Sequence, residues 1–305
     1  MKIISTIELF IVALIWGTAF VAQSVGMDYL GPCAFNASRF TVGAVILIPV
    51  IFLVKAMDRK EGKSAQYSLH DTIKGGICCG CAMAAATLFQ QFGLLYTTVG
   101  KAGFGTSLYI IIVPFLAVVL GKRITGKTWL AAIIAIVGFY FMCISETMTI
   151  NKGDLLVLIC AFLWSVHIHI VDHFAPKANG VMMSSIQFAV SAIICTVGAL
   201  LTESFTWGDI VSCAFPILYA GVMSCGIAYT LQIIAQKNVE PTIACLIMSL
   251  ESVFSALFGW LLLHQTLTGR ELLGCLLVFS GVILAQLPGG KRPSHLDKRR
   301  KSVVS

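Results

Sequence analysis

The chain has 305 residues, of which 58% are hydrophobic and 11% are charged, and its formal net charge is +7. Its mean hydropathy of +0.91 lies far above the values of soluble globular domains. This composition excludes a soluble domain and predicts an all-α integral membrane protein surrounded by the lipid bilayer. No nucleic-acid partner is expected.

Ten apolar runs follow one another along the chain, each about as long as the roughly 20 residues that a helix needs to cross a bilayer. Helices are expected because a segment in lipid must satisfy its backbone hydrogen bonds internally. The runs are Ile4–Val25, Ala34–Lys55, Thr72–Tyr96, Ala102–Gly121, Thr128–Ser145, Gly153–Asp172, Val181–Thr202, Ile210–Gln236, Pro241–Leu263 and Glu271–Leu287. The first run has no clear cleavage site after it, so we interpret it as a spanning helix and not as a signal peptide.

Basic residues lie mainly in one set of connecting segments. If the N-terminus is cytoplasmic, 17 of the 21 Lys and Arg residues lie in cytoplasmic segments, and only Lys101, Lys152 and Arg270 lie in outer loops. Such a bias is typical of the positive-inside rule. It predicts a multi-pass protein of the cell membrane with both termini cytoplasmic. Residues 289–305 form a basic cytoplasmic tail, interpreted as a topology anchor, with binding to anionic lipid as the alternative.

Cysteine and histidine could suggest a disulfide framework or a metal site. Nearly all of the eleven cysteines lie inside apolar runs, where they act as small apolar residues, so no disulfide is predicted. His169, Asp172 and His173 share one helix face, whereas His167 points elsewhere. Because a transition-metal site needs three or four converging ligands, we expect no metal. His167 is instead a candidate protonatable group of a cavity.

The sequence repeats itself. Leu14–Phe20 matches Phe162–Ile168, with Trp16 over Trp164, and Gly121–Leu130 matches His264–Leu273. The offsets of 148 and 143 residues divide the chain into halves at residues 1–147 and 148–288. Five helices in each half force the second half to enter the membrane from the opposite side. Two inverted five-helix repeats are typical of secondary transporters, whose substrate site lies near the midplane.

Several stretches resemble the EamA branch of the drug/metabolite transporter superfamily. They are LIWGTAFVAQ (Leu14–Gln23), FNASRF (Phe35–Phe40), Leu88–Arg123, Ser185–Phe188 and, most specifically, Tyr229–Thr268. The resemblance implies ten helices in two inverted repeats and a permease for small metabolites, such as amino-acid-like compounds, often working in efflux.

Two departures from the family pattern concern its acidic positions. His264-Gln265 stands where the family usually has Gly-Glu, which puts in doubt any proton or gating role of that position. Glu251-Ser252 replaces Glu-Pro and so keeps the carboxylate.

Depth within the runs selects the first candidate cavity residues. Glu251 lies roughly 15 Å into its run, and an acidic residue at that depth is costly and typically functional. The alternative is a structural glutamate that holds two helices together. Trp16 and Trp164 could line a cavity or simply fill space. Arg39 must face protein or water, and a structural or gating role is favoured over substrate binding.

Five further polar residues lie inside otherwise apolar runs, and as a set they suggest a polar cavity. They are Gln90, Gln91, Gln187, Tyr229 and Gln232. Individually, each could equally form a helix-to-helix hydrogen bond.

The predicted function is a secondary transporter of small metabolites that works by alternating access, with export favoured only through the resemblance. No Walker-type motif is present, so no nucleotide or other cofactor is expected, and the chain is not predicted to be an enzyme. Proton coupling and a homodimer stay open. The alternative is an integral membrane enzyme or flippase acting on a lipid-linked substrate, which the short loops disfavour.

Overall fold

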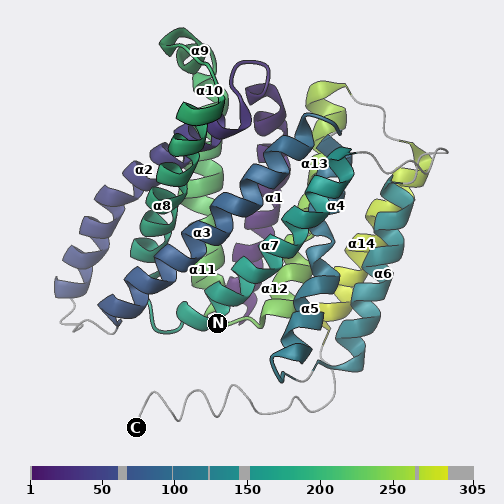
Figure 1. Ribbon diagram of the computed structural model, residues 1–305. Coiled ribbons are helices and arrows are strands. Elements are labelled where there is room, and N and C mark those ends of the chain that lie inside the picture. The colour runs from purple at the N-terminus through teal and green to yellow at the C-terminus, as the bar shows by residue number, and fades with distance from the viewer. Residues whose placement is uncertain are drawn as a thin grey trace.

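The computed structural model describes residues 2–60, 67–97, 99–122, 124–143, 152–264 and 268–287, and within these residues it contains helices and no strand (Figure 1). The helices are α1 (Lys2–Gly26), α2 (Pro32–Lys60), α3 (Leu69–Leu94), α4 (Val99–Ser107), α5 (Tyr109–Val119), α6 (Gly126–Cys143), α7 (Lys152–Phe174), α8 (Gly180–Thr202), α9 (Trp207–Ser212), α10 (Ala214–Tyr219), the π-helix η1 (Ala220–Tyr229), α11 (Thr230–Gln236), α12 (Pro241–Met248), α13 (Leu250–Leu263) and α14 (Gly269–Gln286).

Eight helical segments in the described part of the chain are long and apolar enough to cross a membrane. Two shorter apolar helices, Gly126–Gly138 within α6 and Leu272–Ala285 within α14, accompany them. An all-α, multi-pass membrane protein is therefore confirmed. The count of ten spanning helices stays a prediction, because eight helical segments of the described residues are both long and apolar enough to cross a membrane.

Two predicted runs are not continuous helices. The run Ala102–Gly121 breaks at Leu108, between α4 and α5, and the run Pro241–Leu263 breaks at Ser249, between α12 and α13. The backbone angle ψ is −10° at Leu108 and −13° at Ser249. After each break, a backbone N–H donates to the carbonyl three residues earlier, from Ile111 to Leu108 and from Ser252 to Ser249, as in a 3₁₀ turn. The two breaks are 141 residues apart, close to the offset of the sequence repeat.

The predicted run Ile210–Gln236 also differs from a single α-helix. It begins in the separate surface helix α9, and its middle is the π-helix η1. A Cβ atom on Gly221 of η1 would lie only 3.0 Å from the carbonyl oxygen of Arg39 on α2, so the absence of a side chain there lets the two backbones approach closely. A π-helix carries one extra residue per turn, and such segments are frequent at functional sites.

Helices α6 and α14 pack side by side at one edge of the bundle (Figure 1). Gly138 of α6 faces the carbonyl oxygen of Gly274, and Gly281 of α14 faces the carbonyl oxygen of Ala131, each 2.7 Å from where a Cβ would stand. Small residues allow such close packing between membrane helices. Because this edge pair uses one helix from each half, it joins the halves away from the centre.

The centre of the bundle is organised around α1, which contacts α13, η1, α11 and α12 from the second half of the chain. The apolar side chains of these helices belong to one buried cluster that includes Leu9, Val12, Leu246 and Leu250. Segments from both halves are thus interleaved, and the space between them is where polar residues gather.

Candidate functional site

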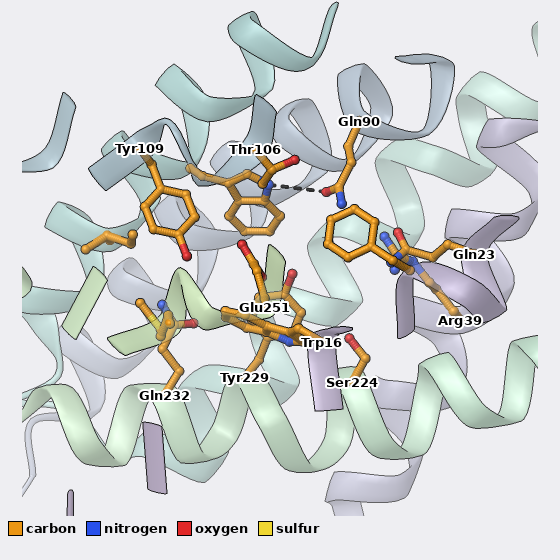
Figure 2. A pocket seen from close by; sticks show the side chains of 14 residues that line it. Trp16, Gln23, Arg39, Gln90, Thr106, Tyr109, Ser224, Tyr229, Gln232 and Glu251 are labelled. Atoms are coloured by element: carbon orange, nitrogen blue, oxygen red, sulfur yellow. Dashed lines mark hydrogen bonds between the residues drawn. The ribbon is translucent and has the colours of Figure 1, made fainter. Parts of the chain in front are cut away.

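A cavity lies in the centre of this bundle. Figure 2 shows side chains from both halves of the chain converging on it. The residues that line it are Trp16, Phe20, Gln23, Arg39, Gln90, Thr106, Tyr109, Trp164, Ile168, Ser224, Tyr229, Gln232, Met248 and Glu251. A concave site with an apolar wall and a few converging polar groups is the usual form of a small-molecule binding site.

Both helix breaks open onto the cavity. Thr106 and Tyr109 lie on either side of the break at Leu108, and Met248 and Glu251 lie on either side of the break at Ser249. The two residues of each pair are three positions apart, so they share one helix face and reach the same space.

Three aromatic side chains form one wall. The ring of Tyr229 lies 4.6 Å from that of Trp16 and 5.7 Å from that of Trp164, measured between centroids. Trp164 is held in place by a hydrogen bond of 3.3 Å from its Nε1 to Gln90 Oε1. The two tryptophans that the repeat relates thus both contact one tyrosine, and aromatic faces of this kind can contact apolar or cationic groups.

Three buried polar atoms of the cavity have no hydrogen-bond partner among the described residues: the donor Trp16 Nε1 and the acceptors Gln23 Oε1 and Gln232 Oε1. The hydroxyl of Tyr109 and the carboxyl group of Glu251 also face this space and form a hydrogen bond with each other. Buried polar groups are normally paired, and each unpaired group is costly. Unpaired donors and acceptors around one space indicate that a polar ligand or water pairs with them there.

The residues that line the cavity include one arginine, Arg39, and one glutamate, Glu251. Both side chains are almost completely buried, at 2% and 4% exposure. Arg39 Nε donates to Asn36 Oδ1 at 2.8 Å, and the guanidinium carbon lies 4.8 Å from the centroid of the Phe40 ring. Within the described residues, neither Arg39 nor Glu251 forms an ion pair.

Seven of the ten sequence-predicted cavity residues lie around this space: Trp16, Arg39, Gln90, Trp164, Tyr229, Gln232 and Glu251. The other three do not line it. Gln91 Nε2 donates to the carbonyl oxygen of Gln23, and His167 Nε2 contacts Gln187 Oε1 at 3.1 Å. His167 packs edge-on against Trp164, so it supports the aromatic wall from outside. A role in substrate binding stays a prediction for all ten.

Sequence reasoning missed several cavity residues, of which Gln23, Thr106, Tyr109 and Ser224 are polar. Gln23 is an amide inside an apolar run, the same signal that selected Gln90, and could have been found. Thr106 and Tyr109 lie within a few residues of the repeat equivalent of Glu251, but neither stands at the equivalent position itself. Nothing in the sequence distinguished the apolar cavity residues Phe20, Ile168 and Met248 from other apolar residues of their helices.

The histidine-rich end of α7 forms a different kind of contact. Asp172 Oδ2 accepts a hydrogen bond of 2.5 Å from Lys122 Nζ, and His169 Nδ1 contacts the carbonyl oxygen of Ser165. No group of three or more potential metal ligands occurs among the described residues. Asp172 is 4% exposed, so its carboxylate is buried against a lysine from the turn that follows α5.

Comparison with known proteins identifies the family. The model of the EamA-like transporter family matches the chain twice, over residues 4–144 and over residues 151–287. The chain belongs to this family. The resemblance seen in its sequence motifs is thereby confirmed, and this EamA-like protein is a membrane transporter of small molecules. The family and its relatives are named as transporters and not as enzymes.

Relatives of this EamA-like transporter match it over nearly their whole length. An uncharacterized transporter of Archaeoglobus fulgidus is 29% identical over 288 residues, which cover 94% of this chain and 87% of the relative. The uncharacterized transporter YoaV of Bacillus subtilis is 24% identical, with 90% and 93% covered. A solved crystal structure with 20% sequence identity superposes with a TM-score of 0.75, covering 94% of this chain and 98% of its own, and so shares the fold.

Proposed function

We propose that this EamA-like transporter is a secondary exporter of a small organic metabolite, amino-acid-like or otherwise, that works by alternating access. The observation that carries the proposal is the central cavity, where unpaired polar groups from both halves of the chain face one space. A site shared by two halves can be exposed to one side of a membrane and then to the other when the halves rock against each other.

The proposed architecture is two inverted five-helix repeats, residues 1–147 and 148–288, followed by a basic cytoplasmic tail at 289–305. Three observations support the repeat: the separate family matches over each half, the helix breaks at Leu108 and Ser249, and the facing glycines Gly138 and Gly281. Counting α4–α5, α12–α13 and α10–η1–α11 as one crossing each, and α6 and α14 as crossings, gives ten.

The proposed cell-membrane topology places both termini in the cytoplasm. The uneven distribution of Lys and Arg supports this orientation. Export is proposed on the family resemblance alone. Proton coupling would require a group that changes its protonation, and Glu251 is the candidate because its carboxyl group lines the cavity without an ion-pair partner in the described residues.

Reconstitution into proteoliposomes tests the function. With a pH gradient and a panel of labelled metabolites, the wild-type protein should exchange at least one of them, and Glu251→Gln should abolish proton-dependent exchange while expression stays near normal. Glu8→Gln makes the same chemical change in α1 outside the cavity and should transport like the wild type. Wild-type transport by Glu251→Gln would remove Glu251 from the mechanism. Turnover of a lipid-linked substrate by detergent-purified protein would instead favour an enzyme.

A further inference from the structure

We infer that the ion pair between Lys122 and Asp172 is a latch that closes the central cavity on the side predicted to be cytoplasmic. The latch must open before the cavity opens to the cytoplasm, and the outer side has no equivalent pair. Because a latch of this kind matters only if the cavity opens to the two sides in turn, the inference rests on the proposed function.

Asp172 lies just beyond the cavity on α7. Trp164 and Ile168 line the cavity, and Asp172 follows Ile168 at the same four-residue spacing. Residues at this spacing share one face of a helix. The carboxylate is buried, and its Oδ2 atom accepts a hydrogen bond of 2.5 Å from Lys122 Nζ. The pair therefore stands one helical turn beyond the wall of the cavity.

Helix α5 leads to the same pair from the first half of the chain. Tyr109 lines the cavity at the start of α5, and Val113 and Ala117 continue the same helix face and are buried. Lys122 follows in the turn after the helix, and α5 and α7 contact each other. Figure 1 shows this end of α5 on the same side of the bundle as the N-terminus, the side predicted to be cytoplasmic. The two helices thus border the route from the cavity to that side.

The break at Leu108 provides a hinge for α5. It separates α5 from α4, and the backbone bond from Ile111 to Leu108 has the three-residue spacing that often marks a hinge within a helix. A rotation at this point moves the far end of α5, which carries Lys122, away from Asp172 on α7. Opening the route between the two helices therefore separates the ion pair.

The sequence repeat shows that the latch has no counterpart on the outer side. The offset of 143 residues makes Gln265 the equivalent of Lys122. The offset of 148 residues makes Ser24 the equivalent of Asp172. Neither of these side chains carries a charge, so the equivalent outer positions cannot form an ion pair. Two identical inverted halves would open to either side at the same free-energy cost. The ion pair adds a cost on the cytoplasmic side alone, so the empty transporter favours the state that is closed toward the cytoplasm.

The distance between the ends of α5 and α7 tests the latch. Leu120 and His173 are exposed and lie next to the pair. Genetically encoded p-acetylphenylalanine at these two positions carries the spin labels, so that the eleven native cysteines stay in place. Double electron–electron resonance on the full-length protein without substrate should give mainly the shorter of two distances.

Variants then show whether the ion pair sets this distance. Lys122→Met and Asp172→Asn should each raise the population with the longer distance at least about threefold. The combined swap of Lys122→Asp with Asp172→Lys should restore the wild-type distribution. Lys74→Met makes the same change at an exposed lysine of α3 and should have no effect. Unchanged distances in the single variants, or a swap that behaves like them, would overturn the inference.

Salt tests the latch without any substitution and covers the case in which the variants do not fold. The lysine side chain is 38% exposed, so high ionic strength should weaken the pair and raise the population with the longer distance in the wild type. An unchanged distribution at high salt would contradict the latch.

Flux of labelled metabolites into proteoliposomes, measured on the same samples, separates the two proposals. Flux by the wild type together with unchanged distances in the variants would overturn the latch and leave the transport function standing. Absence of flux for every metabolite would count against the proposed function, and the latch would fall with it.

Discussion

Gly17 follows the cavity residue Trp16 at the point where α1 crosses α13. A Cβ atom at this position would lie 3.0 Å from the backbone carbon of Phe254 and 3.0 Å from the backbone nitrogen of Ser255. Backbone atoms cannot move aside as a flexible side chain can. The glycine is therefore required by the close approach of the two helices, one from each half of the chain.

Gly17→Ala is expected to destabilise the protein by about 1–3 kcal/mol, the usual cost of forcing an extra methyl group into a packed site. The measurement is the thermal unfolding midpoint of the purified protein. Gly100→Ala is the matched control, since nothing lies within 4 Å of a Cβ added at Gly100. If both substitutions lowered the unfolding midpoint equally, close packing at Gly17 would not be the reason why Gly17→Ala destabilises the protein.

At the scale of elements, an ion pair connects the turn after α5 to α7. Helix α5 ends in a reverse turn at Gly121, with φ +77°, where Gly121 N–H bonds to the carbonyl of Val118 and Lys122 N–H bonds to that of Ala117. This pattern is a Schellman motif, which glycine permits at low cost. It turns the chain so that Lys122 reaches the buried carboxylate of Asp172 at 2.5 Å.

The Lys122–Asp172 ion pair is expected to stabilise the packing of the two halves. Lys122→Met removes one partner of a buried carboxylate. The loss of a partner costs several kcal/mol in a fully buried pair, and about 1–3 kcal/mol is expected here because the lysine side chain is 38% exposed. A double-mutant cycle with Lys122→Met, Asp172→Asn and the combined variant measures the pair in thermal unfolding. The two effects should be non-additive by at least about 0.5 kcal/mol, as for residues in contact. Simple additivity would show that the two side chains do not interact.

The paired helix breaks are the second feature at this scale. Tyr109 lies one residue after the break at Leu108 and Glu251 lies two residues after the break at Ser249, and both line the cavity. Ser249, Ser252 and Ser255 each donate from the hydroxyl to the carbonyl three residues earlier, at 2.7–2.9 Å. Such side-chain bonds compete with the helical backbone pattern and can bend a helix. They give a local reason for the break in the second half.

At the scale of the whole molecule, the inverted repeat makes a prediction about topology. Residues 121–127 and residues 264–270 correspond in sequence, yet five predicted helices lie between them, so they should lie on opposite sides of the membrane. An epitope tag inserted at 124–125 should bind antibody only after the cells are permeabilised, whereas a tag at 266–267 should bind in intact cells. Equal accessibility of both tags would contradict the inverted arrangement.

The sequence by itself determined the class of the protein, because long apolar runs can exist in lipid only as helices that satisfy their own backbone. The repeat between Trp16 and Trp164 indicated two related halves, and the depth of Glu251 marked it as a candidate. These inferences need only the position of a residue along its run.

Tertiary structure alone decided which faces meet. His167 and Trp164 lie three residues apart on α7, yet Trp164 lines the cavity while His167 bonds to Gln187 behind it. A helix with apolar lipid on one side and apolar protein on the other has little contrast between its faces, so its periodicity does not reveal which face borders a cavity. That choice depends on contacts between helices more than a hundred residues apart, such as the meeting of α1 with α13.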